Sequence, residues 1–236
     1  MGLADSPSPS YLVAHHKRTG REVWKSQRMT KADAEQCDSY TTPLLRPTPS
    51  RLELVVMGGN QLDAYDPATG KQLWFLPGLT GGRTITGPTY HDELVYATQG
   101  QRGPLVAVKA SGNGELPNRA IAWKQEQGTP DSCTPVVSGG LLFLVTDNGI
   151  ARCLDAYTGH LKWEKRLAGD YKASPLAAEG RIYFLNTRGL CTVVSAADRY
   201  EKLAENQVDD DTLASLAVSD GCLYLRGHKT LYCIGK

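Results

Sequence analysis

The stretch AYDPATGKQLW, residues 64–74, decides the fold because a close copy of it recurs further along the chain. Residues 153–163 read CLDAYTGHLKW and keep the Asp, the Thr-Gly pair and the Trp at the same spacing. An Asp side chain can accept backbone N–H groups in a turn, and Gly adopts positive φ angles without steric cost. Each copy therefore predicts a tight turn between two strands. The residues expected to form it are Asp66, Thr69 and Gly70 with Trp74, and Asp155, Thr158 and Gly159 with Trp163.

Two further tryptophans extend the repeat, and all four lie at intervals of 40 to 50 residues. Thr19, Gly20 and Trp24 keep the pattern with a His in place of the Asp, while Trp123 follows an insertion of six residues. A fifth copy has lost the signature and has Leu203 at the Trp position, and a sixth copy is incomplete. Self-similarity at such an interval is typical of repeat architectures.

Short apolar segments separated by Gly, Asp and Asn lie between these turns, as in antiparallel strands joined by short connections. Successive strand residues point to opposite faces of a sheet. We therefore expect Leu161 and Trp163 to face a neighbouring sheet, with the charged residues between them in water. Four strands in about 40 residues match one blade of a β-propeller. The strands expected in this fourth unit are 134–137, 141–146, 151–156 and 161–165.

The sequence therefore predicts an all-β fold, a β-propeller of four-stranded antiparallel blades with five to six blade-equivalents. We expect residues 1–236 to form a single domain, since all-β domains of this length are common. Because the turn Gly has no Cβ, a flat indole from an adjacent blade can lie against the turn and dock the two blades together. The expected units are approximately 11–30, 39–80, 83–128, 131–170, 171–211 and 212–236.

The string A-x-D-x-x-T-G-x-x-x-W resembles the tryptophan-docking motif of the PQQ-like repeat, which is named after pyrroloquinoline quinone. That repeat occurs in quinoprotein alcohol dehydrogenases and in non-enzymatic propellers such as the outer-membrane assembly factor BamB. Blade openings similar to the Ser-Pro start of the family occur at Thr42-Pro43, Gly87-Pro88, Thr134-Pro135 and Ser174-Pro175. The resemblance implies a ring of seven or eight blades, of which this chain looks like the C-terminal part. It also implies that the docking tryptophans are structural.

Composition argues against several classes of partner. The 26 Lys and Arg residues nearly balance 25 Asp and Glu residues, so no strong field favours nucleic acid. No apolar run is long enough to span a bilayer, so we expect no direct membrane insertion, and residues 1–10 lack a signal-peptide pattern. The six cysteines form no Cys-x-x-Cys pair, and we expect mostly buried, reduced thiols and no metal site.

No catalytic constellation is evident. The resemblance to quinoprotein dehydrogenases would imply an adjacent cysteine pair at the quinone, and the chain has no Cys-Cys dipeptide. Motifs for a nucleophilic Ser, a phosphate loop or a zinc protease are also missing. The acidic run 209–211 lacks the spacing and the turn Gly of a calcium loop. We therefore expect no catalytic residue and no cofactor, PQQ and calcium included.

The leading hypothesis is a non-catalytic scaffold for protein–protein interaction, with protein partners bound on rim loops or in the central funnel. The segments that depart most from the shortest repeat are 113–120 and 31–40, and they are the best candidates for a specific role. One alternative is a fragment of a PQQ-dependent dehydrogenase whose site lies in missing blades. Another is a sensory or regulatory propeller of a larger bacterial protein such as a kinase. The resemblance implies a periplasmic or otherwise extracytoplasmic location.

Overall fold

The computed structural model describes residues 10–100 and 103–235, and nearly all of their regular structure is strand. The strands form six separate sheets, which we number in chain order. Three sheets hold the N-terminal half. The first contains β1 (Ser10–His15) and β2 (Glu22–Arg28). The second contains β3 (Leu44–Pro47), β4 (Leu52–Gly58), β5 (Gln61–Tyr65), β6 (Gln72–Pro77) and the short β10 (Gly114–Glu115). The third contains β7 (Thr89–His91), β8 (Leu94–Thr98), β9 (Leu105–Lys109) and β11 (Ile121–Gln125).

The other three sheets follow without interruption, and two 3₁₀ helices, η1 (Ala34–Cys37) and η2 (Asn118–Ala120), lie in the N-terminal half. The fourth sheet contains β12 (Val136–Ser138), β13 (Leu141–Val145), β14 (Ile150–Asp155) and β15 (Leu161–Arg166). The fifth contains β16 (Leu176–Ala178), β17 (Arg181–Leu185), β18 (Leu190–Ser195) and β19 (Lys202–Gln207). The sixth contains β20 (Ala217–Ser219), β21 (Cys222–Arg226) and β22 (Leu231–Ile234).

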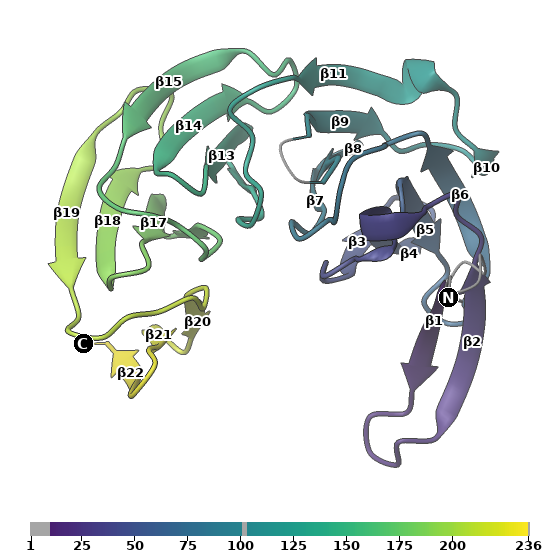
Figure 1. Cartoon of the computed structure of the whole chain (residues 1–236), viewed down its shortest axis with the longest axis horizontal. Coiled ribbons are helices and arrows are strands. Elements are labelled where there is room, and N and C mark those ends of the chain that lie inside the picture. Colours follow the sequence, from purple (N-terminus) through teal and green to yellow (C-terminus); the bar gives the residue numbers. More distant parts are fainter. Residues whose placement is uncertain (1–9, 101–102, 236) are drawn as a thin grey trace, which may run out of the picture.

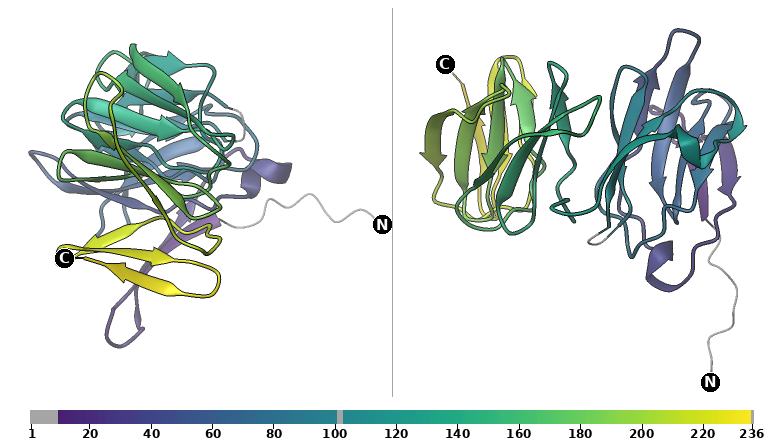
Figure 2. Two further views of the ribbon diagram at one scale, coloured as in Figure 1. Left: turned by 90° about the vertical axis from the view of Figure 1, so that its left-hand side faces the viewer. Right: turned by 90° about the horizontal axis from the view of Figure 1, so that it is seen from above.

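The sheets stand side by side along an arc, with β11, β15 and β19 on its outer side (Figure 1). The arc is open between the first and sixth sheets, and views from the side show the sheets stacked face to face (Figure 2). Within each sheet, strands adjacent in the chain pair antiparallel, and β10 is the one strand of the described residues that pairs parallel inside a sheet. The predicted all-β propeller fold is therefore confirmed, including a two-stranded start and a three-stranded end.

Tight turns join the first two strands of the later sheets. Gly139 and Gly140 have φ angles of 58° and 76°, and Asp220 and Gly221 have φ angles of 49° and 75°. Positive φ at both central positions gives a turn whose twist matches that of the strands it joins. Asp92 occupies the corresponding turn of the third sheet with φ 50°. These turns place short polar side chains on one rim of the arc.

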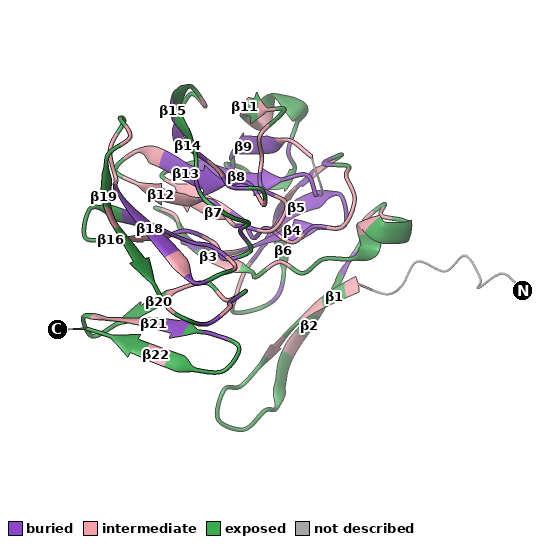
Figure 3. Cartoon of the chain, turned by 60° about the vertical axis from the view of Figure 1, so that its left-hand side comes forward, coloured by how far each residue is buried: buried purple, intermediate pink, exposed green. Residues whose placement is uncertain are grey.

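The hydrophobic core lies in layers between neighbouring sheets. One buried cluster contains Val55 and Trp74 of the second sheet with Val106 of the third, and another joins Phe143 of the fourth sheet to Ile182 of the fifth. The middle sheets are buried, whereas the first sheet and the outer strands of the sixth are largely exposed (Figure 3). Each fully buried aliphatic or aromatic side chain contributes about 1.5–3 kcal/mol. The layers therefore supply most of the stability of the arc.

Hydroxyl groups connect the openings of successive sheets. The N–H of Gly87 donates to Thr134 Oγ1, that of Thr134 to Ser174 Oγ, and that of Ser174 to Ser215 Oγ, each at 2.9 Å. The residue two positions before the first strand of one sheet is thus tied to the same position of the next sheet. Gly87 itself carries no hydroxyl for the corresponding N–H of Thr42. The junction between the second and third sheets therefore lacks this link.

Two details of the sequence-based prediction were wrong. In the fifth sheet, Ala204 pairs with Val193, in the way that Trp74 pairs with Ala64. Ala204 rather than Leu203 thus occupies the Trp position, because the preceding turn is one residue longer, and Leu203 is exposed. In the fourth sheet, Leu161 is also exposed, because a register shift in the facing strand interrupts the alternation beside it.

Candidate functional site

The repeated turns have the same hydrogen-bonding pattern. Asp66 Oδ1 accepts the N–H groups of Ala68 at 2.7 Å and Thr69 at 3.3 Å, and Asp155 Oδ1 accepts those of Tyr157 and Thr158 at 3.1 and 3.0 Å. The Thr hydroxyls accept the N–H two residues further on in the turns at Thr19, Thr69 and Thr158. The carboxylate and hydroxyl thus hold each turn in a fixed shape.

Three of the four indoles reach the turn of the next sheet. Trp24 Nε1 donates to Pro67 O, Trp123 Nε1 to Ala156 O and Trp163 Nε1 to Ala197 O, each at 3.0 Å. Trp24 lies so close to Gly70 that a Cβ at that residue would come within 2.5 Å of the ring. These contacts are the geometry that a docking role requires, and the docking role itself can be tested at the turn glycines.

Replacing Gly159 by Ala should destabilise the chain more than replacing Gly20 by Ala. Both glycines have nearly the same φ, 72° and 71°, so both variants lose about 1 kcal/mol from left-handed backbone strain. A Cβ at Gly159 would lie 2.7 Å from the Trp123 ring, whereas a Cβ at Gly20 meets no described atom within 4 Å. The overpacking should cost Gly159→Ala a further ~1–3 kcal/mol in urea unfolding. Equal losses in the two variants would contradict docking of Trp123.

Trp74 departs from this arrangement. Its Nε1 donates to Glu53 Oε2 of its own sheet at 3.1 Å, not to a turn carbonyl of the third sheet. The insertion 113–120 explains the difference, because β10 pairs with β6 at Trp74 and Phe75, and the N–H of Leu116 donates to Phe75 O at 2.7 Å. The connection between β9 and β11 of the third sheet therefore adds the strand β10 to the second sheet. It does so at the place where a turn of the third sheet would otherwise accept the Trp74 indole.

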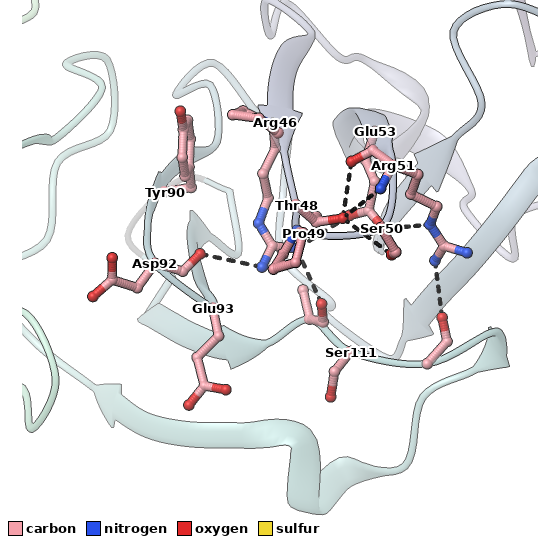
Figure 4. Close-up of a pocket in the computed structure, with 13 residues that line it drawn as sticks. Arg46, Thr48, Pro49, Ser50, Arg51, Glu53, Tyr90, Asp92, Glu93 and Ser111 are labelled. Atoms are coloured by element: carbon pink, nitrogen blue, oxygen red, sulfur yellow. Dashed lines mark hydrogen bonds and ion pairs between the residues drawn. The ribbon is translucent and has the colours of Figure 1, made fainter.

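A buried charge network surrounds Glu53 at this junction (Figure 4). The Glu53 carboxylate accepts hydrogen bonds from Arg46 Nη1 at 3.1 Å and Arg51 Nε at 2.9 Å, besides the Trp74 indole. Arg51 also donates to Asn113 Oδ1 at 2.8 Å and Gly112 O at 3.0 Å at the start of the insertion. The network therefore fastens the insertion to the second sheet.

Arg46 forms the floor of a pocket above this network. Its Nη1 donates to Ala110 O at 3.0 Å and its Nη2 to Asp92 O at 3.3 Å, whereas its buried Nε finds no partner among the described residues. The pocket has a volume of about 720 Å³ and lies between the hairpin turn 47–51 and the turn at Asp92 and Glu93. The hairpin turn brings Pro and Ser/Thr side chains to the wall, and Tyr90 contributes an aromatic ring.

The mouth of the pocket is acidic. The side chains of Asp92 and Glu93 are 63% and 55% exposed, and Lys109 Nζ lies 3.0 Å from the Glu93 carboxylate. Asp92 Oδ2 accepts a hydrogen bond from Tyr157 Oη at 2.5 Å, and this bond raises the pKa of Tyr157 above its ordinary value. Because Tyr157 belongs to the next sheet, this contact also fixes the Asp92 turn relative to the fourth sheet.

Comparison with known proteins gives the family. A family model described as outer membrane protein assembly factor BamB matches residues 9–114 and 113–221, most of the chain. The chain belongs to the BamB family. The BamB of Alteromonas naphthalenivorans, an outer membrane protein assembly factor, is 33% identical over 106 residues, which cover 39% of this chain and 25% of that protein. The family is thus named for assembly and not for a chemical reaction.

The crystal structure of BamB from Moraxella catarrhalis has the same fold. It superimposes with a TM-score of 0.68 at 14% sequence identity, covering 94% of this chain and 65% of that chain. The present BamB-family chain therefore spans a quarter of the curated relative and just under two thirds of the solved structure. At this identity the structural likeness shows the fold alone.

The other segments singled out in the sequence have structural partners in this BamB-family chain. The segment 31–40 contains η1 and lies beside the second and third sheets, where Tyr40 N donates to Thr84 O at 2.8 Å. In the acidic run, the Asp210 carboxylate accepts the N–H groups of Lys229 and Thr230, both at 3.0 Å. Asp211 pairs with Arg188 at 2.8 Å. The run therefore holds the loop between the fifth and sixth sheets to a turn of each of these sheets.

Metal-ligating side chains do not cluster in the described residues of the BamB-family chain. Within residues 10–100 and 103–235, no group of three or more His, Cys, Asp or Glu side chains is arranged to hold a metal ion. The sequence also has no adjacent cysteine pair of the kind expected beside a quinone. In the same ranges, no helix is long and apolar enough to cross a membrane.

Proposed function

We propose that this chain is a non-catalytic scaffold that binds other proteins, and that the pocket between its second and third sheets is a contact site. The observation that carries the proposal is the departure of this one junction from the repeat. The inserted strand β10, the buried network at Glu53 and the enlarged hairpin turn 47–51 occur together here. A feature that the fold itself does not need is a candidate for function.

The surroundings of the pocket favour a partner segment with a basic side chain. Asp92 and Glu93 place two exposed carboxylates at the mouth, while Pro47, Pro49 and Tyr90 supply apolar surface beneath them. An Arg or Lys stem packs on such apolar surface while its charged head pairs with a carboxylate. The rigid floor of Arg46 and Glu53 requires little ordering when the partner binds.

The family supports the wider setting of this proposal. Its members are described as outer membrane protein assembly factors, so we propose that the chain works outside the cytoplasm, in contact with other envelope proteins. We also propose that residues 1–236 act as one domain within a propeller of seven or eight blades. The tryptophan turns are then structural supports for the rim, and catalysis is not required of any residue.

Affinity capture tests the contact site. The chain is immobilised and exposed to detergent-solubilised envelope proteins from the organism that encodes it, beside the double variant Asp92→Asn with Glu93→Gln. The variant removes both charges, and Asn tolerates the positive φ of position 92. We expect the variant to retain less than about half of the partner that the parent captures, since an ion pair formed by an exposed carboxylate contributes about 0.2–1 kcal/mol.

A matched control is available in the sixth sheet. Asp220 occupies the corresponding turn with φ 49°, so Asp220→Asn makes the same chemical change far from the pocket. We expect this variant to capture as much partner as the parent. If the parent captures no protein above background, or if all three proteins capture equal amounts, the proposed contact site is wrong.

A further inference from the structure

Two of the six cysteines lie next to each other in one hairpin. Cys133, Cys153 and Cys191 are buried beside different sheets, and burial raises the pKa of Cys133 and Cys153 to about 12. Such thiols are poorly reactive because the thiolate is the nucleophile. Cys222 and Cys233 differ in that they are partly or fully exposed and belong to the paired strands β21 and β22.

The strand register places these two side chains on one face of the hairpin. Cys233 is directly opposite Tyr224, and Cys222 is two residues from Tyr224 on the same strand, so it points to the same side. The Cys222 sulfur leans over the end of β22, since a Cβ at Gly235 would come within 2.5 Å of it. The Cys222 thiol donates a hydrogen bond to the Cys233 sulfur, which raises the pKa of Cys222 and is in keeping with this proximity.

We propose that Cys222 and Cys233 form a reversible dithiol–disulfide pair that is oxidised by exchange with a small-molecule disulfide. The exposed Cys233 thiolate attacks one sulfur of the disulfide, whose S–S bond breaks, and the leaving thiolate takes up a proton. Cys222 then attacks the Cys233 sulfur of this mixed disulfide and releases the second small thiolate, which is also protonated. The two cysteines are oxidised, and one small disulfide is reduced to two thiols.

The geometry makes this disulfide easy to open again. Diagonal neighbours on paired strands have Cα atoms roughly 7–8 Å apart, which is longer than the usual separation in a disulfide. Closing the bond therefore requires β22 to shift. Among the described strands β22 pairs only with β21, so it is free to move on its outer side. A strained disulfide has a higher reduction potential and is more readily reduced than a structural one.

Thiol counting with peptide mapping tests the proposal. The purified full chain is incubated with glutathione disulfide, then denatured, and its free thiols are counted. We expect the count to fall from six to three, because Cys222 and Cys233 pair and the exposed Cys37 takes up one glutathione, and to return to six after treatment with reduced glutathione. Trypsin cleaves after Arg226 and Lys229, between the two cysteines, so the oxidised chain should yield one linked pair of peptides. Five or six remaining thiols, or glutathione attached to Cys233 without a linked pair, would overturn the proposal.

Three variants separate this pair from the other exposed thiol. Cys37→Ser removes the exposed cysteine of η1 and should leave the linked peptides unchanged. Cys222→Ser should stop at glutathione bound to Cys233, with no link, and Cys233→Ser should give neither product at this hairpin. Loss of the link in Cys37→Ser, or its survival in Cys222→Ser, would show that a different pair reacts.

Discussion

Replacing Trp74 by Ala should lower the free energy of unfolding by about 3–5 kcal/mol, the range for truncation of a buried aromatic side chain. The Trp74 side chain is fully buried in the cluster shared by the second and third sheets. Its Nε1 is also one of the three donors that satisfy the buried carboxylate of Glu53. Truncation therefore opens a cavity and removes a hydrogen bond at the same place. Urea or thermal unfolding followed by circular dichroism measures the loss.

Two companion variants separate these contributions. Trp74→Phe keeps most of the ring but loses the indole N–H, so it should cost about 1–3 kcal/mol, the penalty for removing a buried hydrogen-bond donor. Trp24→Ala removes a half-buried indole from the exposed first sheet and should cost less than Trp74→Ala. The interpretation fails if Trp74→Ala unfolds at the same urea concentration as the parent, or if Trp24→Ala is the more damaging change.

The repeated turn could be predicted from sequence because all its determinants are local. An Asp that accepts nearby N–H groups, a Thr hydroxyl and a Gly with positive φ lie within five residues of each other in the copies at 66–70 and 155–159. Their spacing is therefore visible without knowledge of the fold. The strand layout follows from the same turns, which is why the all-β blade pattern was predictable. The carbonyl acceptors of Trp24, Trp123 and Trp163 were not, since they lie 33 to 43 residues away.

The errors arose where a long-range pairing competes with the local pattern. One extra residue in the turn after β18 moves Ala204 into the place assigned to Leu203. The insertion 113–120 was recognisable as a departure from the repeat, yet nothing local indicates that β10 crosses to the second sheet and pairs parallel with β6. The network at Glu53 was missed for the same reason. Its two Arg residues are ordinary in sequence, its Trp was assigned to blade docking, and the three meet only after the strands pair.

Several departures from the repeat occur together at the junction of the second and third sheets. Between the second and third sheets, the Trp74 indole does not bond to a turn carbonyl, and the hydroxyl link at the sheet opening is missing. The hairpin turn 47–51 of the second sheet is also longer than the corresponding turns of the later sheets. The strand β10 and the charges around Glu53 take over the task of holding the sheets together. The rim turns at 47–51 and at Asp92 therefore need not keep the residues of the repeat. Because β10 and the Glu53 network hold the two sheets together, the side chains that line the pocket are available for specific binding.

Replacing Arg28 by Met should cost about 3–5 kcal/mol, because it leaves a buried carboxylate without its cation. Arg28 lies on β2 of the first sheet and reaches into the second, where its Nε is 3.2 Å from Asp63 Oδ2 and its Nη2 is 2.9 Å from Gly58 O. Burial alone would lower the pKa of Arg28, but the Asp63 carboxylate raises it above its ordinary value. Since the first sheet has few other buried contacts, hydrogen exchange in β1 and β2 should also accelerate.

A double variant tests whether the unpaired Asp63 carboxylate causes the loss of stability in Arg28→Met. Asp63→Asn keeps a side-chain acceptor for the amide of Gln72, which lies 2.9 Å from Asp63 Oδ1, but carries no charge. Arg28→Met combined with Asp63→Asn should therefore be more stable than Arg28→Met alone. Arg188→Met breaks the exposed pair with Asp211 and should change stability little, because surface ion pairs are weak. If the double variant is no more stable than Arg28→Met, the loss comes from missing contacts of the Arg28 side chain and not from an unpaired carboxylate.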